Sequence, residues 1–182
     1  MYRCLRCFLV LTYSLGGVLV ADGQLLRWRA DNKLTWADFK GLVNTASTRD
    51  AHSRTIIRNS YDAVRHGRIY QIKFGMVAGF DRAGSWVRPH AKTIPLLKHE
   101  QLHFDIHELY VRKLYASLSR YNYTGNYDAE AKSIFAGFVK ELRAAQELYD
   151  AESDHSRNKD KQLEWEKKIS EQLNNTPLYP AI

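Results

Sequence analysis

One stretch decides how the chain folds and where its chemistry lies: PLLKHEQLHFDIHELYVRKLYASLS, residues 95–119. Pro95 suits the first turn of an α-helix, and we predict that the helix continues to about Ser119. Helical spacing of four puts the imidazoles of His99 and His103 on one face, one turn apart. Two rings in that arrangement can bind one metal ion between them.

His99, Glu100 and His103 form the motif H-E-x-x-H. Glu100 lies one step round the helix, where it can take a proton from a metal-activated water. Apolar residues continue the histidine face, so the two rings should point toward the protein interior; these residues are Ile106, Tyr110 and Leu114. The alternative interpretation is a pair of hydrogen-bonded histidines on a half-buried helix, with no metal bound.

The rest of the chain divides into a strand-rich first half and a helical second half. Apolar and β-branched residues mixed with polar ones predict strands at residues 55–60 and 68–80. Apolar stripes predict two further helices, one over residues 128–149 and one over 161–173. We therefore expect an α+β fold in which a small antiparallel sheet packs on a zincin-like set of helices.

A catalytic zinc usually has three protein ligands, and we expect the third from the end of the second helix. The segment YDAESDH, residues 149–155, closes the apolar stripe of that helix. We predict His155 as the third ligand because imidazole is a common zinc ligand, with Glu152 as the alternative. A solvated acidic helix end without ligands is the competing interpretation. His107 lies about 12 Å from His99 along the helix axis, so we expect it beside the site or at the surface.

Residues 1–23 have the pattern of a secretory signal peptide, with a basic start, an apolar stretch and small residues at the cleavage site. The apolar stretch is shorter than the roughly 20 residues that span a bilayer, although an uncleaved anchor is the alternative. Cys4 and Cys7 both lie in this segment, so residues 24–182 contain no cysteine and no disulfide. We expect a single domain in a bacterial periplasmic or secreted protein, with no stable membrane insertion.

The chain is basic, with a formal net charge of +7. Loss of residues 1–23 removes Arg3, Arg6 and Asp22 and leaves a net charge of +6. The basic residues are scattered and accompany no recognisable nucleic-acid-binding motif. We therefore do not expect nucleic acid as a partner.

Several blocks of the sequence resemble a bacterial family described as predicted secreted zinc-dependent proteases, a domain of unknown function. The blocks are residues 36–41, 85–87, 99–106 and 149–155, followed by Gln162, Trp165 and Ile169. The family pattern prefers Thr at position 153 and Gly at position 156, whereas this chain has Ser at both. The resemblance implies zinc and peptidase chemistry.

We therefore expect hydrolysis of a peptide or protein substrate, with Zn²⁺ bound by His99, His103 and His155. Glu100 would act as the general base and then protonate the leaving amine. The oligomeric state does not follow from the sequence. Two alternatives remain open, namely a zinc-stabilised module that binds an envelope partner without catalysis, and a hydrolase of cell-wall amides.

Further groups are expected to support this chemistry. Tyr149 would donate to the oxyanion, although a packed tyrosine fits the sequence equally well. Asp150, Glu152 or Asp105 would orient a ligand imidazole. The strand over residues 68–80 would offer its edge to an extended substrate.

Overall fold

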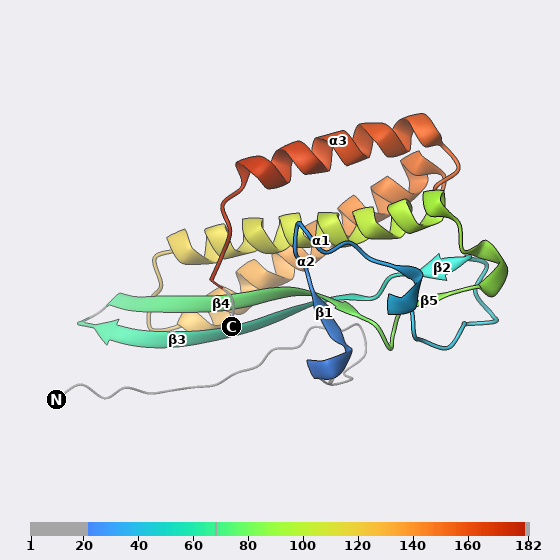
Figure 1. The fold of residues 1–182 in the computed structure, drawn as a ribbon. Coiled ribbons are helices and arrows are strands. Elements are labelled where there is room, and N and C mark those ends of the chain that lie inside the picture. The colour runs from blue at the N-terminus through green and yellow to red at the C-terminus, as the bar shows by residue number, and fades with distance from the viewer. Residues whose placement is uncertain (1–21, 68, 181–182) are drawn as a thin grey trace.

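The structure, a computed structural model, describes residues 22–67 and 69–180. Nearly all of the predicted signal peptide therefore lies outside the described residues. The expected α+β fold is confirmed, because small antiparallel sheets form in the N-terminal half and long helices in the C-terminal half (Figure 1). The strands are β1 (Leu25–Arg27), β2 (Ala51–His52), β3 (Thr55–His66), β4 (Ile69–Asp81) and β5 (Trp86–Val87). The helices are α1 (Ile94–Arg120), α2 (Tyr127–Ser153) and α3 (Lys159–Asn175), and short 3-10 helices lie at Asp22–Gln24, Trp36–Asp38 and Pro89–Ala91.

The main sheet has the strand order β1-β4-β3, and β2 pairs separately with β5. β3 and β4 form a long antiparallel hairpin whose register runs unbroken from the Thr55–Phe80 pair to the His66–Ile69 pair. β3 is therefore longer than the strand that the sequence pattern predicts at residues 55–60. Burial alternates at the start of this extension, with Tyr61 and Ala63 half-buried and Asp62 and Val64 exposed, as in a strand that has one face in solvent.

The strand predicted over residues 68–80 is β4. The expectation that it offers its edge to a substrate is wrong, because β4 is the central strand of the sheet. β3 covers one side of β4, and β1 pairs with its last residues on the other side. On that side, backbone groups of Tyr70, Met76 and Ala78 also form hydrogen bonds, with partners in Trp28, Tyr123, Tyr179 and Pro180. β3 is the edge strand on the opposite side of β4.

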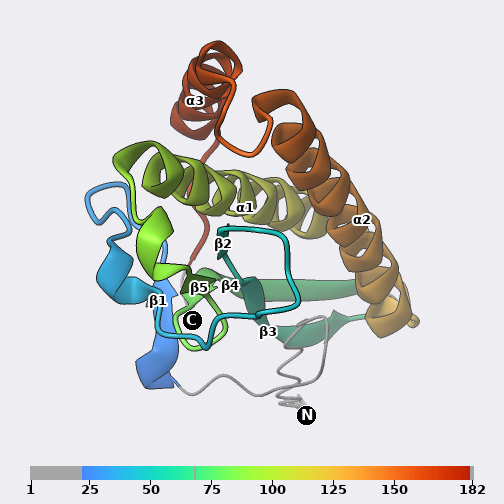
Figure 2. The ribbon, with the colours of Figure 1, turned by 90° about the vertical axis from the view of Figure 1, so that its right-hand side faces the viewer.

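α1 is the helix on which the fold is organised. Its start is set locally, since the Thr93 hydroxyl accepts a hydrogen bond from the Leu96 amide and Pro95 occupies the first turn. α1 packs on β4 through one face and contacts both α2 and α3, as the end-on view shows (Figure 2). None of the described helices has the length and apolar character needed to span a bilayer.

The main core lies where α1, the sheet and the other helices meet. Residues of α1 that face this core are fully buried, among them Ile106, Leu109 and Leu114. The predicted stripe of α3 is also buried, at Trp165, Ile169 and Leu173. This packing fixes the last turns of α2 and the first turn of α3 against the N-terminal half of α1, where the two motif histidines lie.

Candidate metal centre

His99 and His103 face each other across one turn of α1, as their spacing predicts. Their ring centroids lie 4.7 Å apart and their Nε2 atoms 3.1 Å apart. His99 is buried, and only about 15% of the His103 side chain is exposed. The Nε2 atoms of the two rings thus lie close together near the protein interior.

Asp150 from the last turn of α2 completes this group. Its Oδ1 atom lies 3.2 Å from His99 Nε2 and 2.9 Å from His103 Nε2. Among the described residues, His99, His103 and Asp150 are the set whose ligand atoms converge closely enough to hold a metal ion. Because two imidazoles and a carboxylate are common zinc ligands, the donor set has the right chemistry for that ion.

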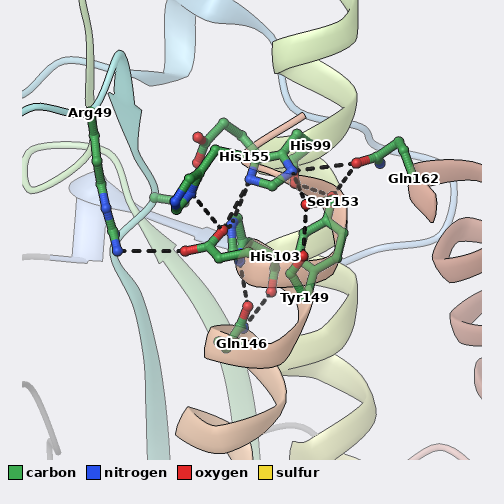
Figure 3. Close-up of polar contacts among 11 residues, drawn as sticks. Arg49, His99, His103, Gln146, Tyr149, Ser153, His155 and Gln162 are labelled. Atoms are coloured by element: carbon green, nitrogen blue, oxygen red, sulfur yellow. Dashed lines mark hydrogen bonds and ion pairs between the residues drawn. The ribbon is translucent and has the colours of Figure 1, made fainter. Parts of the chain in front are cut away.

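The tautomer of His99 follows from Gln162, which reaches the ring from the first turn of α3 (Figure 3). The amide nitrogen of Gln162 donates to Glu166, so its Oε1 atom faces His99 Nδ1 at 3.3 Å. The Tyr149 hydroxyl donates to the same oxygen at 2.6 Å. A carbonyl oxygen only accepts, so Nδ1 of His99 carries the proton and Nε2 is free to bind a metal.

Gln146 fixes His103 in the same way. Its amide nitrogen donates to the His103 backbone carbonyl at 2.9 Å, and its Oε1 atom accepts from His103 Nδ1. Nε2 of His103 is therefore also without a proton. Each imidazole is thus oriented by one glutamine, and each presents the correct nitrogen for metal binding.

Three lone pairs converge at this point, from His99 Nε2, His103 Nε2 and Asp150 Oδ1. Such a group repels itself unless a metal ion or a shared proton stands among the atoms. Metal–ligand bonds of 2.0–2.1 Å in a tetrahedral zinc site place ligand atoms about 3.3 Å apart. The separations here, from 2.9 to 3.2 Å, fit that arrangement with a small expansion.

The charges at the site are coupled. Burial would raise the pKa of Asp150, but when protons instead of a metal ion occupy the Nε2 atoms, hydrogen bonds and charge from His103 and His99 hold this pKa well below its usual range. Burial would lower the pKa of His103, but the hydrogen bond to Asp150 and the negative charges of Glu100 and Asp150 outweigh burial and raise it. Arg49 also lies 3.5 Å from Asp150 Oδ2, so the second carboxylate oxygen faces a cation. The carboxylate is thus held ionised between the histidines and Arg49.

Glu100 lies beside the histidines and is only 4% exposed. The Ser53 hydroxyl, from the segment between β2 and β3, donates to Glu100 Oε2 at 2.5 Å. Glu100, His99, His103 and Asp150 line one cavity of about 930 Å³, which α1 and α2 form with residues 48–57. The carboxylate is therefore held at a fixed place in the same space as the candidate metal ligands.

His155, the predicted third ligand, lies next to the group but outside it. Its Nδ1 atom is 3.6 Å from Asp150 Oδ1, and 53% of its side chain is exposed. Asp154, His155 and Ser156 all adopt positive φ, of 46°, 50° and 80°, so the chain turns back sharply after α2. Left-handed backbone costs about 1 kcal/mol or more for each residue that is not glycine. This turn returns the His155 ring toward Asp150.

The other acidic candidates point away from the histidines. Glu152, the alternative third ligand, accepts a hydrogen bond from the Trp165 indole at 2.7 Å. Asp105, proposed to orient an imidazole, accepts from the Trp28 indole at 2.7 Å and from Gln101 at 2.8 Å. The structure therefore brings neither carboxylate to the site.

Tyr149 is fully buried and supports the site from behind. Its ring stacks on His99, with centroids 4.6 Å apart, and meets His103 edge-on. Its hydroxyl donates to Gln162 and lies 3.3 Å from the His99 carbonyl oxygen, on the side away from the cavity. Burial raises the pKa of this phenol, so it remains neutral. This position suits the packed tyrosine of the sequence interpretation better than an oxyanion donor.

Sequence reasoning did not find Gln146 or Ser53, it named Gln162 only as part of the family resemblance without a role, and it gave Asp150 only an orienting role. A signal for two of them exists, because Gln146 and Asp150 are spaced by four on the face of α2 that carries Leu142 and Tyr149. Polar side chains that recur in a buried stripe need polar partners. Ser53 lies in a short connection and has no such signal.

The comparison with protein families adds one finding, while no curated protein and no solved structure matches the chain. The family match covers residues 85–156, a segment that includes α1 and α2 and thus every candidate ligand described above. Over this segment the chain is similar to DUF922, a family of bacterial proteins of unknown function.

Proposed function

We propose that the protein is a zinc-dependent peptidase that is exported to the periplasm or the medium. The observation that carries this proposal is the convergence of two correctly oriented imidazoles and a carboxylate beside a buried glutamate. His99, His103 and Asp150 would hold the zinc ion. When bound there, zinc supplies a Lewis acid that makes water nucleophilic at neutral pH and polarises a carbonyl group.

The residues of the chain would carry the proton transfers. Glu100 takes a proton from the attacking water, and the Ser53 hydrogen bond keeps the carboxylate in place. Glu100 then gives the proton to the amine that leaves when the peptide bond breaks. Only 4% of Glu100 is exposed, so its carboxylate has little contact with bulk water.

The edge strand supports a peptide as the substrate. Thr55 and Ile57, which alternate on β3, line the same cavity as the histidines. A strand at the edge of a sheet can hydrogen-bond an extended chain through its unpaired backbone groups. Pairing with an extended substrate, which the sequence analysis expected of residues 68–80, is thus better suited to β3.

Metal removal tests the proposal directly. We expect the purified protein to bind one zinc ion per chain and to cleave members of a random library of fluorescence-quenched peptides. A chelator should abolish cleavage, and added zinc should restore it, because the three ligands provide the only metal group among the described residues. Metal content is measured by mass spectrometry. A protein that binds zinc but cleaves neither peptides nor cell-wall fragments would instead favour the binding module.

Tyr149→Phe tests the supporting role of the phenol. The variant keeps the ring stacked on His99 and loses one buried hydrogen bond to Gln162. We expect kcat to fall by less than about 10-fold and stability by about 1 kcal/mol. An oxyanion donor would instead contribute about 100-fold or more to kcat. Peptide kinetics and thermal unfolding measure both quantities, and a loss of that size would return Tyr149 to the reaction.

A further inference from the structure

His107 is a buried polar residue that the proposed chemistry does not use. It lies on α1, one turn beyond His103, and is 2% exposed. Its burial corrects the expectation of a surface position. Neither of its ring nitrogens has a hydrogen-bond partner among the described residues. Buried polar groups are almost always paired, so this one needs an explanation.

The ring of His107 is neutral at physiological pH, because burial lowers its pKa to about 4. A neutral imidazole has one N–H group and one bare nitrogen. The Ile56 backbone carbonyl is close enough to oppose this pKa shift slightly, although it is not in hydrogen-bond geometry. That carbonyl favours the tautomer whose N–H faces it, which leaves the bare nitrogen as an acceptor.

His107 belongs to the wall of the same cavity that holds the candidate metal centre. Apolar side chains also line this cavity, namely Ile57 from β3, which follows the Ile56 whose backbone His107 approaches, and Val139 and Leu142 from α2. We call His107 and these three apolar residues the inner pocket. The helical rise from His103 to His107 is about 6 Å, which matches the length of one large side chain.

The geometry points to the inner pocket as the site for one substrate side chain, which is neutral, has an apolar body and ends in a hydrogen-bond donor. Tyrosine and glutamine have this chemistry. The apolar walls would bury the body of the side chain. Both ring nitrogens of His107 have almost no accessible surface, so the ring would turn toward the cavity for its bare nitrogen to accept the terminal hydrogen. A lysine ammonium is disfavoured because burying an unpaired charge is costly. His107 is thus a specificity residue of the proposed peptidase, on which this inference rests.

Fragment binding tests the pocket without any catalysis. p-Cresol and toluene reproduce the side chains of tyrosine and phenylalanine and differ only in the hydroxyl group. We expect p-cresol to bind the purified protein about 10-fold more tightly than toluene, as one hydrogen bond of about 1.4 kcal/mol requires. Only p-cresol should shift the ring-nitrogen resonances of His107 in spectra of ¹⁵N-histidine-labelled protein.

His107→Phe should remove this preference, so that toluene binds at least as well as p-cresol. His107→Gln retains an acceptor and should restore part of the preference. If His107→Phe does not fold, Val139→Phe fills the pocket from the opposite wall and should weaken both fragments alike. Equal binding of the two fragments to the wild-type protein would overturn the inference.

Peptide cleavage separates this inference from the proposed function. Peptides that differ only by Tyr or Phe next to the scissile bond should differ about 10-fold in kcat/KM, and His107→Phe should remove the difference. If p-cresol binds at His107 but no peptide is cleaved, the proposed function fails and the inner pocket stands. If peptides are cleaved without preference and the fragments bind equally, the pocket assignment fails and the function stands.

Discussion

Glu100→Gln should abolish peptide cleavage while leaving zinc in place. The change removes the group that accepts a proton from water but keeps the size of the side chain and its contact with Ser53. General base catalysis contributes about 100- to 10,000-fold, so we expect kcat to fall within that range. Glu100 is not among the three converging ligand atoms, so the zinc content should stay at one ion per chain.

Glu147→Gln is the matched control for this variant. Glu147 lines the same cavity from α2 but is exposed, and it belongs to a different helix from the motif. The control makes the same chemical change and the same loss of charge, so it reports any general effect of charge on substrate binding. Its kcat should remain within a few-fold of the wild type. If Glu100→Gln keeps both zinc and wild-type cleavage, the proposed mechanism is wrong.

The helices could be predicted from the sequence because their signals are local. α1 begins at Ile94 and ends at Arg120, one residue beyond the predicted range at each end. Pro95 and the four-residue periodicity lie within the helix itself. The position of β4 within the sheet could not be predicted, since β1 and the C-terminal Tyr179 reach it from distant parts of the chain.

The candidate site could be predicted only where it lies on one helix. The spacing of His99 and His103 determines that their rings meet. Which residue of the segment 149–155 reaches them depends on how α2 packs against α1, and a periodic pattern does not set that rotation. The left-handed turn was also hidden, because Ser156 has a φ of 80° at a position where glycine would signal such a backbone.

The third ligand should prove to be Asp150, so Asp150→Asn should lower zinc affinity by about 100-fold or more. Loss of a group that merely orients a ligand costs about 10- to 100-fold, and loss of a ligand costs more. Asp154→Asn is the matched control, because it makes the same change four residues later in an exposed side chain that forms an ion pair with Arg157. Affinity is measured by competition with a chromophoric chelator.

His155→Asn is the decisive comparison. Asparagine tolerates the left-handed backbone at this position, so the turn should survive the change. If His155 only faces the Asp150 carboxylate, zinc affinity should fall by less than about 10-fold. A loss equal to that of His103→Asn, with a smaller loss in Asp150→Asn, would instead make His155 the third ligand. Large and equal losses of zinc affinity in His155→Asn and Asp150→Asn would indicate four protein ligands. Such a closed site leaves no position for substrate and is structural.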